Sequence, residues 1–184
     1  MRSKSLTLST IARLLKVEEH RLIYLCDQGQ ISPDIEDARG RGKSRQFSRR
    51  NLLEFAVALR LREAMASVAT VRAVIRVLRS FERLVRTKIP GFRLPEGLEG
   101  TGAPDLRVII SDARFLYFSL GPGKSRPRLF GGIDIEHGPP QRAVLRPVKA
   151  IKGPAFGAPE GSKHSRLELS ITEVARSLPS VDGV

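Results

Sequence analysis

A segment rich in glycine and proline divides this chain into two parts with different sequence periodicities. Seven of the 16 residues from 89 to 104 are Gly or Pro, a composition typical of a linker. Before this segment, apolar residues recur every three to four positions, which predicts amphipathic helices. After it, β-branched and aromatic residues form short runs separated by turns, which predicts strands. The order of helices and then strands predicts an α+β fold with a small β-rich C-terminal module.

The longest helical pattern, Val68 to Thr87, combines an apolar stripe with arginine-rich remaining faces. Ser67 is its N-cap candidate and Pro90 ends it. About 20 residues at about 1.5 Å each give a helix of roughly 30 Å. A stripe of this length needs a partner surface, and no other segment is an obvious cover. We therefore expect residues 67–88 to form a dimer interface, made by Val71, Val74, Ile75, Leu78, Phe81 and Val85.

Two short helices joined by a tight turn are predicted near the N-terminus. The first runs from about Ser9 to Leu15 with Thr7 as its N-cap, and the second runs from about Glu19 to Gln28 and stops at Gly29. Helices of this size and spacing match a helix-turn-helix, whose second helix enters the major groove of DNA.

Three residues near the start of the second helix are candidate DNA contacts. We expect His20, Arg21 and Tyr24 on its exposed side. From there Arg21 can reach a base edge or a phosphate, and Tyr24 a phosphate oxygen. The alternatives are a half-buried packing residue for Tyr24 and an exposed residue without a role for His20.

The segment from Ile31 to Phe47 predicts a hairpin wing. Its ends, 31–35 and 45–47, fit two short strands, and the glycines between them allow a turn. Ser48 is the N-cap candidate of the next helix, which runs to about Ala64. Residues 39–50 contain six basic residues and no acidic one, a density suited to neutralising phosphates; a flexible solvated tip is the alternative. The predicted DNA contacts in this region are Arg39, Arg41, Lys43, Arg45 and Arg49.

The charge balance favours a polyanionic partner. Thirty-two Lys and Arg against 19 Asp and Glu give a net charge of +13 and a pI of about 11.0. Residues 1–88 hold 19 of the basic and 9 of the acidic residues, so most of the excess positive charge lies in the helical part.

Cys26 is the only cysteine, which excludes an intrachain disulfide and a multi-cysteine metal site. We expect no cofactor and no metal. The apolar residues near the N-terminus are too interrupted for a signal peptide, and no run is long enough to span a membrane, so we expect a soluble cytoplasmic protein.

Four segments occur in an order and at a spacing that a known family shares. They are Thr7-Leu-Ser-Thr-Ile-Ala-Arg-Leu-Leu, then Val17, Leu22, Tyr24 and Gly29, then Arg45-Gln-Phe-Ser-x-x-Asn-Leu52, and finally Arg60-Leu-Arg-Glu63 with Ser67 through Arg72. Over about residues 5–86 the chain resembles the DNA-binding domain and pairing helix of MerR-family transcription regulators. The resemblance implies a winged helix-turn-helix, a homodimer held by an antiparallel coiled coil, and a palindromic promoter site that is often bent and untwisted. It also implies RNA polymerase as a further partner, a nucleoid-associated location, and DNA contacts from Arg21, Tyr24, Arg41, Lys43 and Arg45.

The chain departs from the family's pattern at several positions. Lys16 stands where the family has a turn glycine, so we expect a slightly strained turn or a turn of different shape. Ile23-Tyr-Leu-Cys26 replaces Arg-Tyr-Tyr-Glu, which removes one phosphate-contacting arginine and one aromatic residue. Phe47 replaces a tyrosine and Asn51 an aspartate.

The C-terminal half predicts strands but no recognisable site. Strands are expected at about 106–110, 115–120, 128–135, 142–151 and 166–172, with a disordered tail over 176–184. Residues 121–124 lack the spacing of a phosphate loop, and no nucleophile elbow supports a triad of Ser111, Asp112 and His137. His137 and His164 have no partners at metal-ligand spacing. The aromatic set Phe115, Tyr117, Phe118 and Phe130 is most simply a small core, and a ligand pocket is the alternative.

These observations predict a sequence-specific double-stranded DNA-binding transcription regulator that acts as a dimer and is not an enzyme. Two alternatives stay open. An architectural or excisionase-like DNA-binding protein would share the two-helix-plus-wing plan. An enzyme would need its site in the C-terminal module, where no polar cluster has catalytic spacing.

Overall fold

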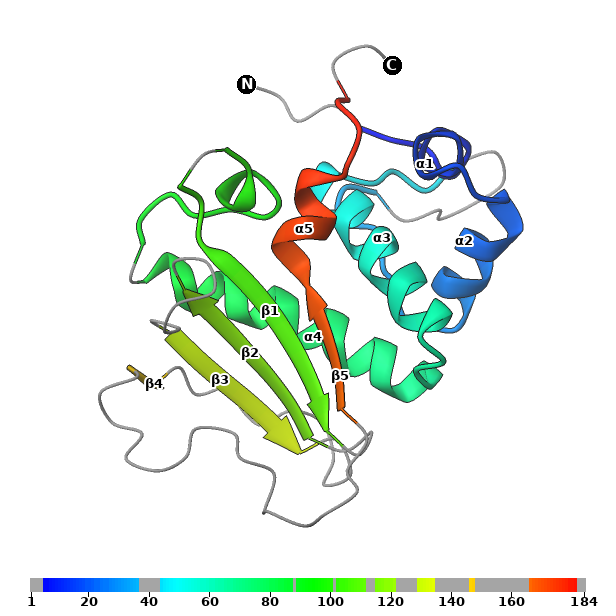
Figure 1. Cartoon of the computed structure of the whole chain (residues 1–184). Coiled ribbons are helices and arrows are strands. Elements are labelled where there is room, and N and C mark those ends of the chain that lie inside the picture. Colours follow the sequence, from blue (N-terminus) through cyan, green and yellow to red (C-terminus); the bar gives the residue numbers. More distant parts are fainter. Residues whose placement is uncertain are drawn as a thin grey trace.

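The protein combines helices with an antiparallel sheet, as expected for an α+β fold (Figure 1). The computed structural model describes residues 5–36, 44–87, 89–100, 102–111, 115–121, 129–134, 146–147 and 166–181. Its elements are α1 (Leu8–Leu15), α2 (Glu19–Asp27), α3 (Arg49–Glu63), α4 (Val68–Arg86), the 3-10 turn η1 (Glu96–Leu98), β1 (Asp105–Ser111), β2 (Phe115–Gly121), β3 (Leu129–Asp134), β4 (Arg146–Pro147), β5 (Arg166–Ser170) and α5 (Ile171–Arg176).

The first two helices begin and end where the sequence predicts. The Thr7 side chain accepts a hydrogen bond from the Thr10 amide and caps α1. Lys16 then turns the chain in the left-handed region, with φ of 54°. A residue with a Cβ pays about 1 kcal/mol there, which agrees with the strained turn expected at this position. Gly29 takes the same conformation after α2 without that cost.

Of the hairpin expected after α2, the described residues include the base. Glu36 and Gln46 form an isolated antiparallel bridge, and Phe47 bridges back to Leu6. The strand predicted over 31–35 is not formed. Ser48 caps α3 as predicted and, with Asn51, completes a capping box.

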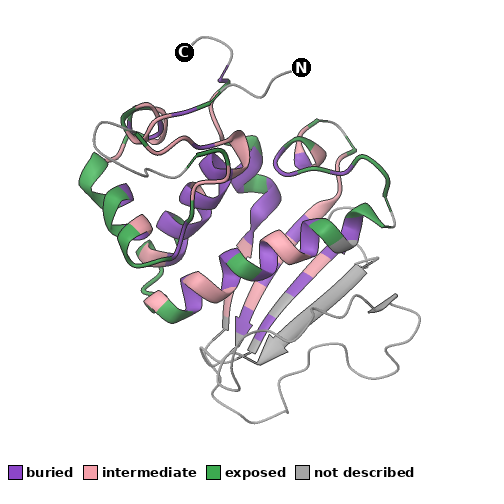
Figure 2. Ribbon diagram, turned by 180° about the vertical axis from the view of Figure 1, so that it is seen from behind, coloured by how far each residue is buried: buried purple, intermediate pink, exposed green. Residues whose placement is uncertain are grey.

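Helix α4 covers one face of the sheet (Figures 1 and 2). The six side chains predicted to form a dimer interface are at most 2% exposed within the single chain. Phe81 stacks on Phe118 of β2, with ring centroids 5.5 Å apart. The expectation that no other segment covers the apolar stripe of α4 is therefore wrong, because the sheet of the β-rich half packs against it. The periodicity of a helix does not predict where the strands pack.

The described residues of the glycine- and proline-rich segment pack against the rest of the protein and do not form an extended linker. Phe92, Leu94 and Leu98 are at most 5% exposed and belong to the same core as α3, α4 and the sheet. Gly97 fits because it lacks a Cβ, which would lie 2.7 Å from the Phe92 ring. The helical part and the sheet of the described residues therefore share one continuous core.

The sheet has the strand order β4-β3-β2-β1-β5, and all neighbours are antiparallel. In the central pair, Leu106, Val108 and Ile110 of β1 are buried. They lie opposite residues of β2 that are also buried, namely Leu120, Phe118 and Leu116. The intervening β1 residues Arg107 and Ile109 are only half-buried, so the other face of β1 is partly open to solvent.

The chain returns to the helical part through β5 and α5. The strand predicted over 166–172 ends at Ser170, whose side chain accepts from the Glu173 amide and starts α5. Thr172 accepts from the Leu106 amide at 2.7 Å and donates to the Pro104 carbonyl, which fixes α5 to the start of β1. The predicted disordered tail is wrong for 176–181, because α5 extends to residue 176 and Val181 is 8% exposed. Among the described residues, no helix combines the length and apolar character needed to cross a bilayer.

Candidate nucleic-acid interface

Helix α2 presents one polar face to solvent and anchors the other in the core. Leu22 and Leu25 are 0% and 2% exposed, because their spacing of three residues places both on the inner side. His20, Arg21 and Tyr24 are all exposed, as the sequence predicts. Tyr24 is 46% exposed.

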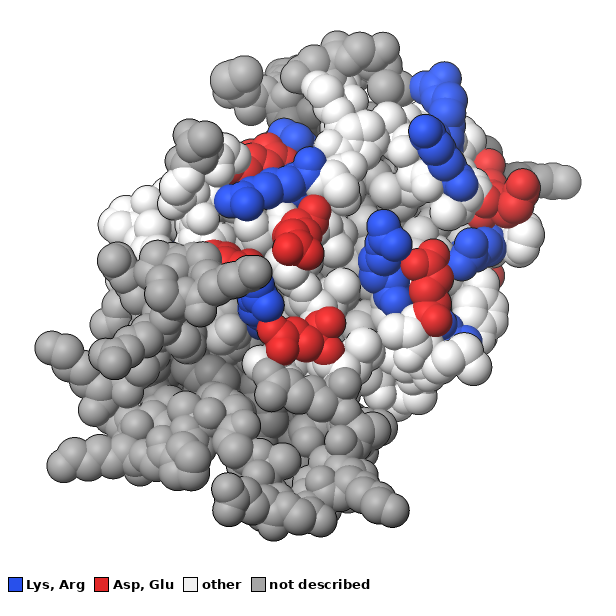
Figure 3. Space-filling view, in the orientation of Figure 1, with Lys and Arg blue, Asp and Glu red and all other residues white. Residues whose placement is uncertain are grey.

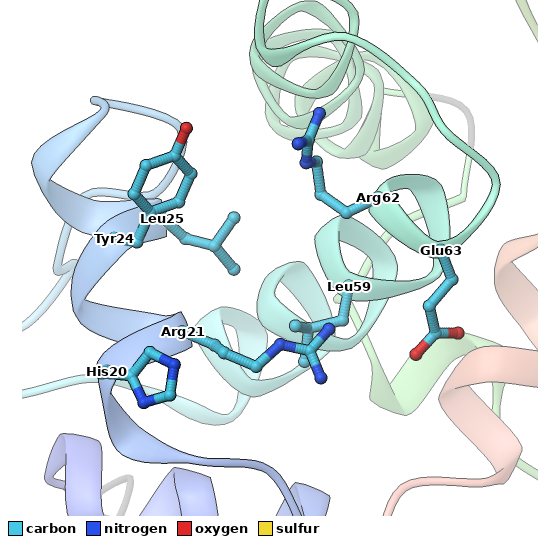
Figure 4. Close-up of a pocket in the computed structure, with 7 residues that line it drawn as sticks. All are labelled: His20, Arg21, Tyr24, Leu25, Leu59, Arg62 and Glu63. Carbon is cyan, nitrogen blue, oxygen red and sulfur yellow. The ribbon is translucent and has the colours of Figure 1, made fainter.

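These three side chains line a groove between α2 and the C-terminal end of α3 (Figure 4). Its volume is about 380 Å³ and its apolar floor is made by Leu25 and Leu59. Arg21 extends into the space between the helices, while Tyr24 and Arg62 stand on opposite sides of it. The contribution of α3 to this groove does not follow from the sequence pattern.

Arg62 and Glu63 form the α3 side of the groove. The Arg62 guanidinium donates to the Ala66 carbonyl at 2.6 Å, which holds the side chain at the end of the helix. Glu63 lies 3.5 Å from Arg60, an exposed pair one turn apart. The groove thus has two arginines over an apolar floor, with its one carboxylate already beside a third arginine.

The described part of the hairpin approaches the far end of α2. The Gln46 amide donates to the Glu36 carbonyl at 2.8 Å, and the reverse bond is 3.3 Å. The Arg45 guanidinium lies 3.3 Å from Asp27, the last residue of α2. Arg39, Arg41 and Lys43, the predicted contacts at the tip, lie outside the described residues.

Arg49 is separate from this group. Its guanidinium pairs with Glu99 of the glycine- and proline-rich segment at 2.8 Å. It lies at the start of α3, whereas the groove lies at the end of that helix, roughly 20 Å away along the axis. The structure therefore does not bring Arg49 together with His20, Arg21 and Tyr24.

A buried carboxylate, Glu54, joins α3 to α4, and the sequence analysis does not predict its role. Its side chain is 0% exposed and accepts two hydrogen bonds of 2.6 Å from the Arg79 guanidinium. Asn51 also donates to it at 2.7 Å. The hydrogen bond with Glu54 raises the pKa of Arg79, which favours the protonated guanidinium. A glutamate between Leu53 and Phe55 in an apolar run is the signal that could have identified it.

The same pair holds the backbone at the base of the hairpin. Arg79 donates to the Ser32 carbonyl at 2.8 Å, and Asn51 donates to it at 3.1 Å. The Asn51 side-chain oxygen accepts from the Asp34 amide at 3.1 Å. Segment 32–34, which leads into the hairpin, is therefore positioned by side chains of α3 and α4.

A second cluster extends this network across the start of α3. Asp34 accepts from the Ser48 amide at 2.9 Å and from the Ser48 hydroxyl, and pairs with Arg50 at 3.1 Å. Arg50 also lies 3.4 Å from Glu82 of α4, which in turn accepts from the Leu94 amide at 3.3 Å. The hairpin base, α4 and the segment 89–104 are thereby linked by charged side chains.

Phe47, at the position where the MerR-family pattern has tyrosine, is a core residue. It is 0% exposed and meets Phe55 edge to face, with centroids 5.4 Å apart and an interplanar angle of 66°. Its backbone pairs with Leu6, so the ring and the chain together fix the return of the hairpin to α3.

Comparisons with family models, curated proteins and solved structures find no match for this chain. Within the part of the chain that the structure describes, no three His, Cys, Asp or Glu side chains are grouped as metal ligands would be.

Proposed function

We propose that the chain is a sequence-specific, double-stranded DNA-binding transcription regulator in which α2 reads the major groove. The observation that carries this proposal is the exposed set of His20, Arg21 and Tyr24 on a helix anchored by two buried leucines. An arginine and a tyrosine on an exposed helix face suit base-edge and phosphate contacts. The net charge of +13 supports a polyanionic partner.

The hairpin based on Glu36 and Gln46 is proposed as a wing on the DNA backbone. Its sequence places Arg39, Arg41 and Lys43 beyond that base, and Arg45 lies at the end of α2. Arginine and lysine in this number would release counterions from phosphates. The resemblance to MerR-family regulators supports the same reading and adds RNA polymerase as a proposed partner.

Binding as a homodimer is also proposed, because a palindromic site would match a two-fold protein. The dimer cannot use the apolar stripe of α4 while the sheet covers it. Light scattering of the native chain at micromolar concentration measures the oligomeric state, and a stable monomer there and on DNA would contradict the dimer.

The test of the function is selection of bound sequences from a random duplex pool, followed by fluorescence anisotropy on the enriched sequence. We expect an inverted repeat and a loss of about 10-fold or more in affinity for Arg21→Ala, equivalent to about 1.4 kcal/mol. Arg93→Ala, at an exposed position in the segment 89–104, serves as the control and should bind like the native chain. Binding without enrichment would favour an architectural protein, and no binding at all would contradict the proposal.

A further inference from the structure

The solvent-facing side of α4 consists almost entirely of arginine. The exposed residues of this helix in the described chain are Ala69, Arg76, Arg83 and Arg86, and half-buried Arg72 and Arg79 lie in the same row. At about 100° per residue these five arginines fall within an arc of roughly 80°, over roughly 21 Å of helix. We name them the arginine stripe. Figure 2 views the molecule from the side on which α4 lies in front of the sheet.

Two arginines of the stripe have hydrogen-bond or ion-pair partners elsewhere in the protein. The other three form no ion pair with any described acidic residue. Arg72 donates to the Gln28 carbonyl at 2.6 Å, and Arg79 pairs with Glu54. Arg76, Arg83 and Arg86 form no ion pair with the described residues. Their charges are therefore available to a partner.

The arginine stripe destabilises α4, because all its side chains carry the same charge. Its members are spaced three or four residues apart, so like charges are neighbours on the surface, which destabilises a helix. A face that only keeps a helix soluble would alternate both signs, as the face shown in Figure 3 does. All five residues are arginine and none is lysine, and arginine's fork of donors matches phosphate oxygens.

The stripe borders the surface proposed to contact DNA. Arg72 reaches the end of α2 at Gln28, and Arg79 reaches Ser32 on the way to the hairpin. The row of arginines thus starts beside α2 and continues past the hairpin base along α4. A duplex held by α2 and the hairpin would present phosphates next to this row.

We propose that Arg76, Arg83 and Arg86 bind phosphates of the DNA backbone outside the groove read by α2. This inference rests on the proposed DNA-binding function and adds a contact surface to it. Such contacts raise affinity and its salt dependence without reading sequence, because phosphates are the same at every base pair.

The test compares two double variants that remove the same charge. Arg76→Gln with Arg83→Gln changes the stripe, and Arg93→Gln with Arg176→Gln changes two exposed arginines elsewhere. Affinity for the enriched duplex is measured by anisotropy over a salt series. The stripe variant should lower the slope of log K against log salt by about 1.8, since each phosphate contact contributes about 0.9. The control should change it by clearly less, and both variants should keep the same preferred sequence.

The outcomes separate this inference from the proposed function. If the native chain binds DNA and Arg21→Ala weakens it, but the stripe and control variants give the same slope, the stripe assignment is wrong and the function stands. If the native chain binds no duplex, both are wrong. Thermal unfolding guards against misfolding: removing like-charge neighbours should leave the stripe variant at least as stable as the native chain.

Discussion

Two arginine–carboxylate clusters in this molecule have similar distances but very different surroundings. Arg79 is 28% exposed and meets Glu54 at 2.6 Å, and Glu54 is 0% exposed between α3 and α4. Arg107 meets Asp105 at 2.5 Å and Glu168 at 2.8 Å on the sheet, where the three side chains are 29%, 13% and 33% exposed. In both, hydrogen bonds to carboxylates raise the arginine pKa, with Glu168 the larger cause for Arg107. We therefore expect the two clusters to contribute differently to stability despite their similar contact distances.

The difference arises from desolvation. Removing a charge from water costs several kcal/mol, and a buried pair recovers this only while both partners are in place. A pair near the surface loses less hydration and gains less from pairing, so its net contribution is small. Glu54 also fixes the base of the hairpin through Arg79 and Ser32, whereas the Arg107 cluster joins the neighbouring strands β1 and β5.

Replacing Arg79 by Ala should have the largest effect on stability. It removes the two short hydrogen bonds to buried Glu54 and leaves the guanidinium of Arg50, 3.9 Å away, as its remaining ion-pair partner, which should lower the free energy of unfolding by about 3 kcal/mol. Urea unfolding measures the change. Arg76→Ala, three residues earlier on the exposed side of α4, is the matched control and should stay within about 0.5 kcal/mol. Similar losses in the free energy of unfolding for Arg79→Ala and Arg76→Ala would contradict the stabilising role of the pair with Glu54.

Removing both charges should cost less than removing one. Glu54→Leu combined with Arg79→Met replaces the buried pair by apolar side chains, and we expect it to recover about 2 kcal/mol relative to Arg79→Ala. Some loss should persist, because Ser32 and Asn51 each lose a hydrogen-bond partner. A double-mutant cycle with the two single variants gives the coupling energy. If the effects of the single changes simply add, the buried-pair explanation fails.

This contrast also marks what the sequence can predict. Thr7 and Ser48 act as caps because a cap depends on residues within three positions, and α2 faces outward as its spacing predicts. The Glu54–Arg79 pair joins residues 25 positions apart, and no local pattern encodes that contact. The packing of the sheet against the apolar stripe of α4 is not predictable from the sequence for the same reason. Ser170 could have been predicted, since a serine three residues before Glu173 is a helix-start signal.

At the groove, the α2 side was predictable and the α3 side was not. His20, Arg21 and Tyr24 follow from the periodicity of a single helix. Leu59, Arg62 and Glu63 reach the same groove only because α3 packs against α2. Charge density in the sequence predicts Arg49 as a DNA contact. In the structure its guanidinium donates to Glu99, a residue 50 positions away in the sequence.

Replacing Arg107 by Ala should have a smaller effect, within about 1 kcal/mol, because this cluster is partly hydrated. The effect should shrink further in high salt, which screens exposed charges more than buried ones. Urea unfolding of the native chain, Arg107→Ala and Arg79→Ala at low and high salt tests both statements. A loss for Arg107→Ala as large as that for Arg79→Ala would show that hydration does not separate the two clusters.

The exposed pair of Asp27 with Arg45 should contribute little to stability and show its effect in binding instead. Their side chains are 56% and 32% exposed, so Asp27→Asn should change the free energy of unfolding by no more than about 0.5 kcal/mol. Removing this carboxylate beside the proposed DNA surface should raise affinity for duplex DNA, because the negative charge of Asp27 no longer repels the phosphates. Glu96→Gln, which removes an exposed acid from η1, is the control for net charge. Equal gains for the two variants would mean that total charge, and not the position of Asp27, governs binding. A gain confined to Asp27→Asn would place the end of α2 at the DNA.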